Sequence, residues 1–411
     1  MVRKRPLIAM VAYTFYASDP RVRRHVSALV ADGYDVDVLA LRNPKAAEEK
    51  GDEHVEFFLL RTRHYADQQP KFKIVWEYVL FALACSYVLF RNHLFRGGYS
   101  LIHINNMPNF LVFSALSLRL LRVPVVLDVH DTMPEIYRDR FKVGPEHWVI
   151  RLMLLEERIS MRFASFVITT EHTKWERLIE NGLKRDKSIV TLNLPDSSIF
   201  PSQAQPGSPA DSKNGFKLVY HGTLTQRLGM DIAIRAMDQL KDRIPNICLD
   251  IIGDGEQRQE LLELTQHLDL GDYVHFSPGF IPTNELPQAL AGADLAVVPS
   301  RNRIGTSLML PTKLLEYVRL GIPCVTVATP TTSHYFDEDQ VRFVPSEDVS
   351  ALAEQILYLY NHPEERLTMA NAARRFYDQY SFETERDRYL NLIRDITRKK
   401  ASKSEQRNKG D

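Results

Sequence analysis

Short apolar runs alternate with amphipathic stretches along most of the chain. Runs of strand length stand at 7–12, 36–40, 101–105, 125–129, 165–169 and 188–192, and again at 216–220, 247–252, 274–277, 294–299 and 322–328. Stretches with apolar positions at helical spacing separate them, among them 21–31, 148–163, 230–240 and 349–361. The alternation predicts parallel sheets with crossover helices, and therefore an α/β protein of two doubly wound, Rossmann-like domains.

The rhythm breaks once, near the middle of the chain. The turn residues of 193–200 are followed by FPSQAQPGSPADSKNG at 200–215, which is rich in Pro, Ser and Gly and has no periodicity. We therefore expect a first domain over 1–200, a linker or flexible loop over 201–215 and a second domain over 216–380. A final helix should follow over about 381–397, and the polar 398–411 predicts a disordered tail.

Composition narrows the class of protein. With 411 residues, 44% of them hydrophobic and 25% charged, the chain is long enough for two separate cores. Its formal net charge of zero gives no basic excess for nucleic acid. Cys85, Cys248 and Cys324 lie in apolar runs without metal-ligand spacing, which is typical of reduced, buried thiols. The start of the chain lacks the apolar core of a signal peptide, so the cytoplasm is the expected location.

The segment 71–96 is unusually apolar for a surface helix. It is short for a membrane span, which needs about 20 apolar residues, and a strand resumes at 101–105, so we interpret it as a crossover helix. The alternative is that one face, with Trp76, Phe81 and Phe90, lies in a membrane interface where a lipid-borne acceptor would be found. Residues 72–96 are therefore a candidate for peripheral contact with the inner face of a membrane.

The stretch 302–321, NRIGTSLMLPTKLLEYVRLG, lies between two strand-like runs. Pro311 suits the first helical turn, and Leu314, Leu315 and Val318 give the helix an apolar stripe. The amides and the positive dipole end at the start of this helix suit an anion, with Lys313 on the first turn and Glu316 about one turn later. The alternative is an ordinary crossover helix with solvated Lys and Glu side chains.

Polar side chains also follow the strand at 125–129, where the carboxyl ends of parallel strands form ligand sites. His130, Asp131 and Glu135 stand there, and a neutral imidazole at His130 could hydrogen-bond a sugar hydroxyl. Asp128, His130 and Asp131 are within four residues of each other, but no second cluster completes a metal shell, so we expect no metal.

The turn at 13–20 offers a second set of polar residues in the first domain. Asp19 suits a helix N-cap with Pro20 at the first helical position, and Arg21 follows. These residues are candidates for acceptor binding, although the cap alone explains Asp19, and capping with surface charge is the favoured interpretation of the group.

Glycines punctuate the strand ends of the second half. Gly222 lets backbone amides approach a ligand, and Arg227 supplies a fork of donors suited to phosphate oxygens, although a solvated loop arginine remains the alternative. Gly253 and Gly255 form a turn after the strand at 247–252. A dinucleotide motif would need a third glycine where Arg258 stands.

Three of these segments resemble one known family. PTKLLEYVRLGIPCV at 311–325 looks like the nucleotide-binding helix of GT-B glycosyltransferases of the large retaining family 4. DVHDTMPE at 128–135 resembles the segment that carries the family's donor-facing histidine, and 221–229 resembles its Gly-Arg-Leu-x-x-x-Lys-Gly loop. The resemblance implies two Rossmann-like domains facing a central cleft, with a C-terminal helix that crosses back to the first domain.

The resemblance also assigns donor-binding positions. Glu316 would hold the ribose, and the backbone around Met309, Leu310, Pro311 and Thr312 would meet the donor, as would Gly222, Thr223, Gly253, Gly255 and Phe280. The family's second glutamate is Leu308 here, and its two basic loop positions hold Thr223 and Leu228. We carry the diphosphate role to the neighbouring Arg227.

The implied function is retaining transfer of a sugar from a UDP-, GDP- or dTDP-sugar to a glycan or lipid-diphosphate saccharide, in bacterial polysaccharide or cell-surface glycan synthesis. Arg227, Lys313 and helix amides would stabilise the leaving diphosphate without metal or cofactor, with His130 facing the donor. Asp19, Arg21, Asp131 and Glu135 would lie on the acceptor side. The alternatives are a sugar-nucleotide epimerase or hydrolase on the same fold, or a catalytically idle binding scaffold, which Leu308, Thr223 and Leu228 suggest.

Overall fold

The computed structural model describes residues 5–43, 53–62, 71–202 and 215–408. The chain forms two compact units, Met1–Leu192 with Glu383–Asp411, and Asn193–Phe382. Both changes of unit therefore lie close to the predicted boundaries at 200 and 381. The predicted linker at 201–215 lies almost entirely outside the described residues.

Unit 1 contains a parallel seven-stranded sheet in the order β3-β2-β1-β4-β5-β6-β7 among the described residues. Its strands are β1 (Leu7–Val11), β2 (Asp35–Arg42), β3 (Val55–Thr62), β4 (Tyr99–Asn105), β5 (Val125–Val129), β6 (Phe166–Thr169) and β7 (Ser188–Val190). In the register, Val11 lies opposite both Leu39 and Ile104. The strand order reverses between β1 and β4, which is where doubly wound folds bind their ligands.

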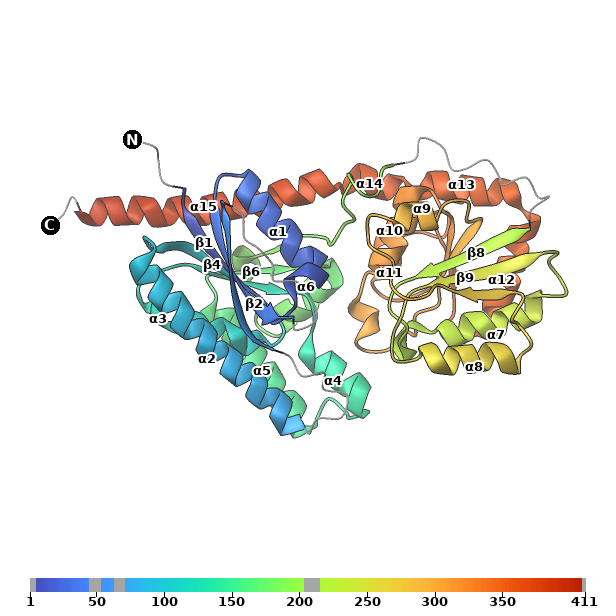
Figure 1. Cartoon of the computed structure of the whole chain (residues 1–411), viewed down its shortest axis with the longest axis horizontal. Coiled ribbons are helices and arrows are strands. Elements are labelled where there is room, and N and C mark those ends of the chain that lie inside the picture. The colour runs from blue at the N-terminus through green and yellow to red at the C-terminus, as the bar shows by residue number, and fades with distance from the viewer. Residues whose placement is uncertain (1–4, 44–52, 63–70, 203–214, 409–411) are drawn as a thin grey trace. The chain divides into compact units, whose positions relative to one another are not determined.

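Helices cover both faces of this sheet (Figure 1). They are α1 (Pro20–Ala31), α2 (Lys71–Phe95), α3 (Leu116–Leu120), α4 (Met133–Phe141), α5 (Trp148–Phe163), α6 (His172–Glu180) and α15 (Phe382–Asn408), with 3-10 helices η1 (Tyr16–Ser18), η2 (Asn109–Ala115) and η3 (Arg185–Lys187). Alternate residues of β1 point to opposite faces: Ala9 packs in the core with α2 and α5, and Met10 packs in the core with α1 and α15. The C-terminal helix thus completes the first unit, as predicted.

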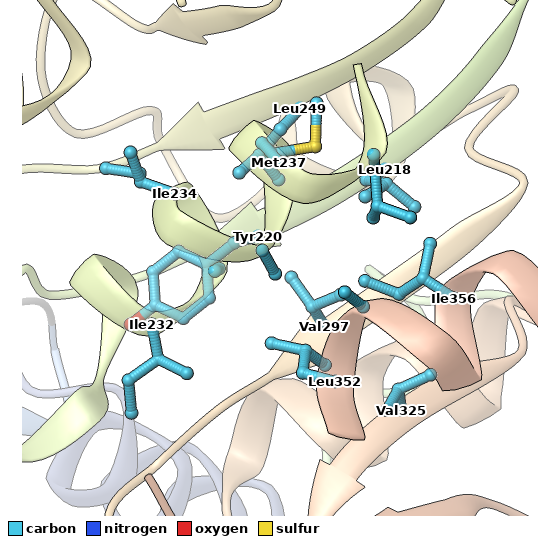
Figure 2. Close-up of a cluster of buried hydrophobic side chains, with 14 of the residues drawn as sticks. Leu218, Tyr220, Ile232, Ile234, Met237, Leu249, Val297, Val325, Leu352 and Ile356 are labelled. Atoms are coloured by element: carbon cyan, nitrogen blue, oxygen red, sulfur yellow. The ribbon is translucent and has the colours of Figure 1, made fainter. Parts of the chain in front are cut away.

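Unit 2 repeats the plan with a six-stranded parallel sheet in the order β10-β9-β8-β11-β12-β13 among its described residues. Its strands are β8 (Phe216–His221), β9 (Ile247–Ile252), β10 (Val274–Phe276), β11 (Leu295–Val298), β12 (Cys324–Val327) and β13 (Arg342–Val344). Its helices are α7 (Met230–Leu240), α8 (Arg258–His267), α9 (Leu286–Ala289), α10 (Thr312–Leu320), α11 (Thr332–Tyr335), α12 (Val349–Asn361), α13 (Pro363–Ala373) and α14 (Arg375–Gln379), with η5 (Gln226–Leu228) and η6 (Thr306–Leu308). Figure 2 shows side chains of β8, α7 and α12 interdigitating in its core, with the Tyr220 ring among them.

Several elements differ from the predictions. Strand β3 lies at the sheet edge and lacks clean apolar alternation, so the pattern did not reveal it. Helix α15 continues through Asn408, where a disordered tail was expected, because Lys, Ala, Glu, Gln and Arg are strong helix formers even without packing. Residues 409–411 lie outside the described residues. Cys85 and Cys324 are buried free thiols as predicted, whereas Cys248 is only half-buried.

Candidate functional site

Helix α10 begins at the carboxyl end of strand β11. Pro311 is its N-cap, one position before the predicted first turn, and Gly321 ends it in the left-handed conformation. Leu314, Leu315 and Val318 are buried and anchor the helix. The Leu314 N–H donates to the Pro311 carbonyl at 3.0 Å, and the amides before it, of Thr312 and Lys313, are too early in the helix for an intrahelical acceptor, so this end carries a partial positive charge.

Lys313 extends from this helix end into a buried position. Its Nζ donates to the Tyr220 hydroxyl at 2.7 Å and lies 4.1 Å from the centre of the Tyr220 ring. Among the described residues it forms no ion pair. Burial lowers its pKa to about 7, and Arg227 also lowers it while Glu316 raises it. A Cβ atom at Gly222 would lie 3.2 Å from Nζ, so the glycine leaves the ammonium room.

Glu316 is oriented by a histidine that the sequence analysis did not single out. The His221 backbone N–H donates to the Tyr317 hydroxyl at 2.8 Å, and the same hydroxyl lies 2.8 Å from His221 Nδ1. The ionised Glu316 carboxylate can only accept, so the other ring nitrogen, Nε2, donates to it. Burial raises the Tyr317 pKa well above its usual value, which keeps this hydroxyl protonated.

Arg227 lies on η5 with an exposed side chain, and its Nη1 is 3.9 Å from Met309 Sδ. Its backbone is held by Arg301, whose N–H donates to the Arg227 carbonyl at 2.9 Å. The Arg301 guanidinium pairs with Asp231 at 2.7 Å and donates to the Gln226 carbonyl. The turn is therefore fixed while the Arg227 guanidinium stays available to a ligand.

Glycines bring the ends of β8 and β9 together. A Cβ atom at Gly253 would lie 1.9 Å from the Gly222 carbonyl oxygen, and one at Gly255 would lie 2.3 Å from that of Leu224. Neither contact is possible, so only glycine permits this approach. Arg258, which replaces the third glycine of a dinucleotide motif, donates to the Gly253 carbonyl at 2.8 Å and closes the turn.

The other candidates for donor binding differ in their exposure to solvent. The Thr223 carbonyl accepts from the Tyr220 hydroxyl at 2.9 Å, and Thr223 is exposed. Thr312 is exposed and Leu310 is buried. Phe280 lies on the loop after β10 with 65% of its surface exposed. The structure thus brings together Gly222, Arg227, Met309, Lys313 and Glu316, and this group is the candidate donor site of unit 2.

In unit 1, His130 is buried just after β5. Its Nε2 is 3.0 Å from Asp128 Oδ2, and its backbone N–H donates to Asn106 at 2.9 Å. The same carboxylate oxygen lies 3.4 Å from His103 Nε2 and 3.6 Å from His25 Nδ1. Burial raises the pKa of Asp128, but the three imidazoles outweigh it and hold the pKa well below the usual value.

This cluster contains a group of possible metal ligands that the sequence analysis did not find. His25, His103 and Asp128 offer ligand atoms within 4.8 Å of one another, although they come from α1, β4 and β5. Spacing along the chain could not reveal this group. Burial lowers the His25 pKa to about 3, so its ring is neutral, and Tyr389 stacks on it with 4.2 Å between ring centres.

The acceptor-side candidates fall into two groups. Asp19 caps α1 as predicted, accepting from the Arg21 backbone N–H at 3.1 Å, and the two side chains pair. Burial raises the Asp19 pKa, but the opposing effects of Arg21 and, more weakly, His130 are larger and leave the pKa below its usual value. The effect of His130 shows that Asp19 lies near the end of β5. Asp131 is half-buried there. Glu135 is instead buried, and both of its carboxylate oxygens accept from Arg177, at 2.7 and 2.9 Å, because α4 packs beside α5 and α6.

The chain matches two known family models. The model of the glycosyl transferases group 1 matches residues 202–376, and that of a glycosyl transferase 4-like domain matches residues 18–193. The chain spans about half the length of the curated relatives that it matches. One is a GDP-mannose-dependent alpha-(1-6)-phosphatidylinositol monomannoside mannosyltransferase from Mycolicibacterium smegmatis, 30% identical over 41% of this chain and 45% of that protein.

Solved structures share the whole architecture. Sucrose-phosphate synthase from Thermosynechococcus elongatus superposes with a TM-score of 0.75 at 21% identity, covering 95% of this chain and 99% of that one. HepE from Anabaena, in complex with UDP, gives a TM-score of 0.69 at 18% identity, covering 95% of this chain and 100% of that one. The fold, the two matched segments and the motifs therefore agree: the chain is a GT-B protein that belongs to the group 1 glycosyltransferases of the family 4 type.

Proposed function

We propose that the chain is a retaining glycosyltransferase whose second unit binds a nucleotide sugar through its diphosphate. The observation that carries this proposal is Lys313, a buried ammonium without an ion-pair partner among the described residues, at the amino end of α10. A buried cation is costly unless an anion compensates it. A diphosphate placed at a helix amino end would supply that charge.

The same groups account for catalysis without a metal ion. As the bond between sugar and diphosphate breaks, negative charge develops on the leaving phosphate. Lys313, the Arg227 guanidinium and the first-turn amides of α10 are fixed before reaction, so they stabilise this charge without reorganising, by several kcal/mol on the order of known oxyanion sites. Glu316, oriented by His221, would accept hydrogen bonds from the ribose hydroxyls.

The route of the substitution is proposed by analogy with the family. No side chain in the sequence is an evident nucleophile, so attack on the same face of the sugar, with the leaving phosphate as base, is the preferred mechanism. His130 would face the donor sugar, and Asp19, Arg21, Asp131 and Glu135 would lie on the acceptor side. Of these, Glu135 already accepts from Arg177 with both carboxylate oxygens, so it is the weakest of the acceptor-side candidates.

The names of relatives guide the choice of substrates. The mycobacterial relative is named for GDP-mannose and a phosphatidylinositol mannoside, and the HepE structure contains UDP. We therefore keep UDP-, GDP- and dTDP-sugars as donor candidates and propose a glycan or lipid-linked saccharide as acceptor. The setting would be polysaccharide or surface-glycan synthesis in the cytoplasm of a bacterium.

A thermal-shift screen of sugar nucleotides, followed by a transfer assay with the best donor, tests the proposal. Ligands of the folded state raise the unfolding temperature, so the true donor should stand out. Release of free nucleoside diphosphate without an acceptor, or conversion of the donor alone, would indicate a hydrolase or an epimerase. Binding without turnover of any acceptor would indicate an idle scaffold, and no binding by any sugar nucleotide would contradict the donor site.

A further inference from the structure

Helix α2 carries an apolar stripe on its solvent side. Trp76, Leu83, Tyr87, Phe90 and Leu94 are all exposed, Trp76 by 59%, and their spacing places them on one side of the helix. The opposite side is also apolar and is buried in the core of unit 1 through Phe81, Cys85 and Leu89, which corrects the predicted membrane-facing role of Phe81. A crossover helix of a globular domain normally presents a polar outer face, and α2 does not.

The length of α2 does not make it a membrane span. Residues Lys73–Phe95 are long and apolar enough to cross a bilayer, and 22% of that window is buried. Strands β3 and β4, which precede and follow the helix, belong to the same sheet. The helix therefore packs along that sheet, and its exposed stripe can at most lie against a surface.

Two neighbouring helices extend the stripe. Helix α5 exposes Trp148, Leu152, Leu155 and Ile159, Trp148 by 71%, again on one side of the helix. Helix α3 exposes Leu116 and Leu120. The segment η2, which leads into α3, packs against both α2 and α5, and all of them share one core, so the three helices lie in one layer on the same face of the sheet (Figure 1). We call the outer side of this layer the α2–α3–α5 face.

The exposed charged groups on this face are mostly basic. Among described side chains, those of these helices and of the turn after α3 are Lys73, Arg91, Arg122, Arg151, Arg158 and Arg162. The exposed carboxylate of Glu146, just before α5, pairs with Arg151. On α5 the three arginines follow one edge of the apolar stripe. The acidic side chains of the same helices are turned away from solvent: Glu77 bonds to Tyr13, Glu156 bonds to Ser160, and Glu157 bonds to Arg177.

We infer that the α2–α3–α5 face binds the surface of a lipid bilayer that contains anionic headgroups. Tryptophan and tyrosine favour the boundary between water and hydrocarbon, and arginines beside them favour anionic lipid. A second copy of the chain fits less well. In a twofold interface each face meets itself, so most of these cations would face cations, and the neighbouring exposed carboxylate, Glu146, is already paired with Arg151.

Vesicle flotation with the full chain tests this surface without any donor or acceptor, so it is independent of the proposed function. The probes are phosphatidylcholine vesicles with and without about one-third phosphatidylglycerol. We expect binding to the anionic vesicles and little to the neutral ones. Each basic residue near an anionic surface contributes about 1 kcal/mol, so replacing Arg91, Arg122 and Arg162 by Gln should weaken binding by about a hundredfold.

The apolar contribution is tested separately. Trp76→Gln, Leu83→Gln, Trp148→Gln and Leu152→Gln combined should lower vesicle binding by about a hundredfold, because exposed aromatic and aliphatic side chains provide most of the insertion energy. The matched control is Tyr358→Gln with Leu367→Gln, two exposed apolar residues of unit 2, which should bind vesicles as the wild type does. Far-ultraviolet circular dichroism checks each variant for folding, and single substitutions replace any combination that fails.

Tryptophan fluorescence gives a local readout. Trp76 and Trp148 lie on the face, and the third tryptophan of the chain, Trp175, is half-buried on α6. Brominated lipids should quench the wild type, Trp76→Phe and Trp148→Phe should each lose part of that quenching, and Trp175→Phe should not. The proposal is overturned if the wild type does not float with anionic vesicles, or if the variant with glutamine at Trp76, Leu83, Trp148 and Leu152 floats equally well. It is also overturned if sedimentation shows a dimer that the same substitutions dissociate while vesicles remain unbound.

Discussion

Each unit buries a titratable group near a strand end, Asp128 in β5 and Lys313 on α10, but the two groups are balanced in opposite ways. In unit 1 the Asp128 carboxylate lies beside the imidazoles of His25, His103 and His130, which hold its pKa low. In unit 2 the close partners of the Lys313 ammonium, among the residues that the structure describes, are the Tyr220 hydroxyl and ring, and burial lowers its pKa to about 7. Unit 1 compensates its buried charge internally, whereas unit 2 leaves a buried cation for an incoming anion.

This difference separates structural from ligand-dependent charge. Removing a compensated carboxylate should cost stability, because its partners lose their hydrogen bonds. Removing the uncompensated cation should cost ligand affinity and leave the free protein intact. Four experiments test the comparison.

The largest expected effect is on the stability of unit 1. Asp128→Ala removes the buried carboxylate that accepts from His103 and lies within 3.6 Å of His25 and His130, and should lower the free energy of unfolding by about 3–5 kcal/mol. Urea denaturation measures it. Asp128→Asn is the matched control, since it keeps the shape and one acceptor oxygen and should lose less. Equal stability of the alanine variant and the wild type would show that the cluster is not a compensated unit.

The next effect is on donor affinity in unit 2. Lys313→Met should weaken binding of a sugar nucleotide by about a hundredfold, the loss expected for one charged hydrogen bond in a buried site. Because burial of the ammonium is unfavourable, the ligand-free variant should unfold at the same or a higher temperature. Calorimetric titration and a thermal melt measure the two quantities. A variant that loses stability but keeps affinity would reverse the comparison.

Arg227 provides a smaller and purer test of ligand-directed charge. Its side chain is exposed, so Arg227→Ala should leave the unfolding temperature unchanged and weaken nucleotide-sugar binding by about tenfold. Arg303→Ala, at a half-buried arginine of the loop between β11 and η6, serves as the control. Unchanged affinity in both the Arg227 and the Lys313 variants would remove the site assignment.

The smallest effect is a pH dependence that follows from Lys313. In the free protein this lysine releases its proton near pH 7, and a bound diphosphate favours the charged form. Binding above pH 7 therefore takes up a proton and weakens as pH rises, by about fivefold between pH 7 and pH 8. Titrations in buffers of different ionisation enthalpy measure the uptake. Lys313→Met should show neither the pH dependence nor the uptake.

The periodic parts of the fold were predictable and the non-periodic parts were not. Helices such as 230–240 and strands such as 125–129 bury one side or both, and the buried positions must be apolar. Apolar residues therefore recur at the spacing of a helix or form a run of strand length. Edge strand β3 is only partly covered, so its pattern is weak. The end of α15 depends on helix propensity rather than on packing, which is why a polar tail concealed a helix.

The candidate site shows the same division. Lys313, Glu316 and Gly222 could be selected from the sequence because helix starts and strand ends are recognisable local features. His221 and Tyr220 stand at the end of a strand too, but only the fold shows that they contact α10. His25 and His103 reach Asp128 from separate elements, and no local pattern reports a contact between distant segments.

Tyr220 connects the hydrophobic core of unit 2 with Lys313 of the candidate donor site. Its ring is fully buried among core side chains, as Figure 2 shows, while its hydroxyl accepts from Lys313. A substitution that shifts the ring, for example at the adjoining Ile232, therefore changes where the ammonium lies although it touches no substrate. If Lys313 holds a diphosphate as we propose, substitutions in the interior of unit 2 can therefore alter donor affinity without any change to a residue that touches the donor.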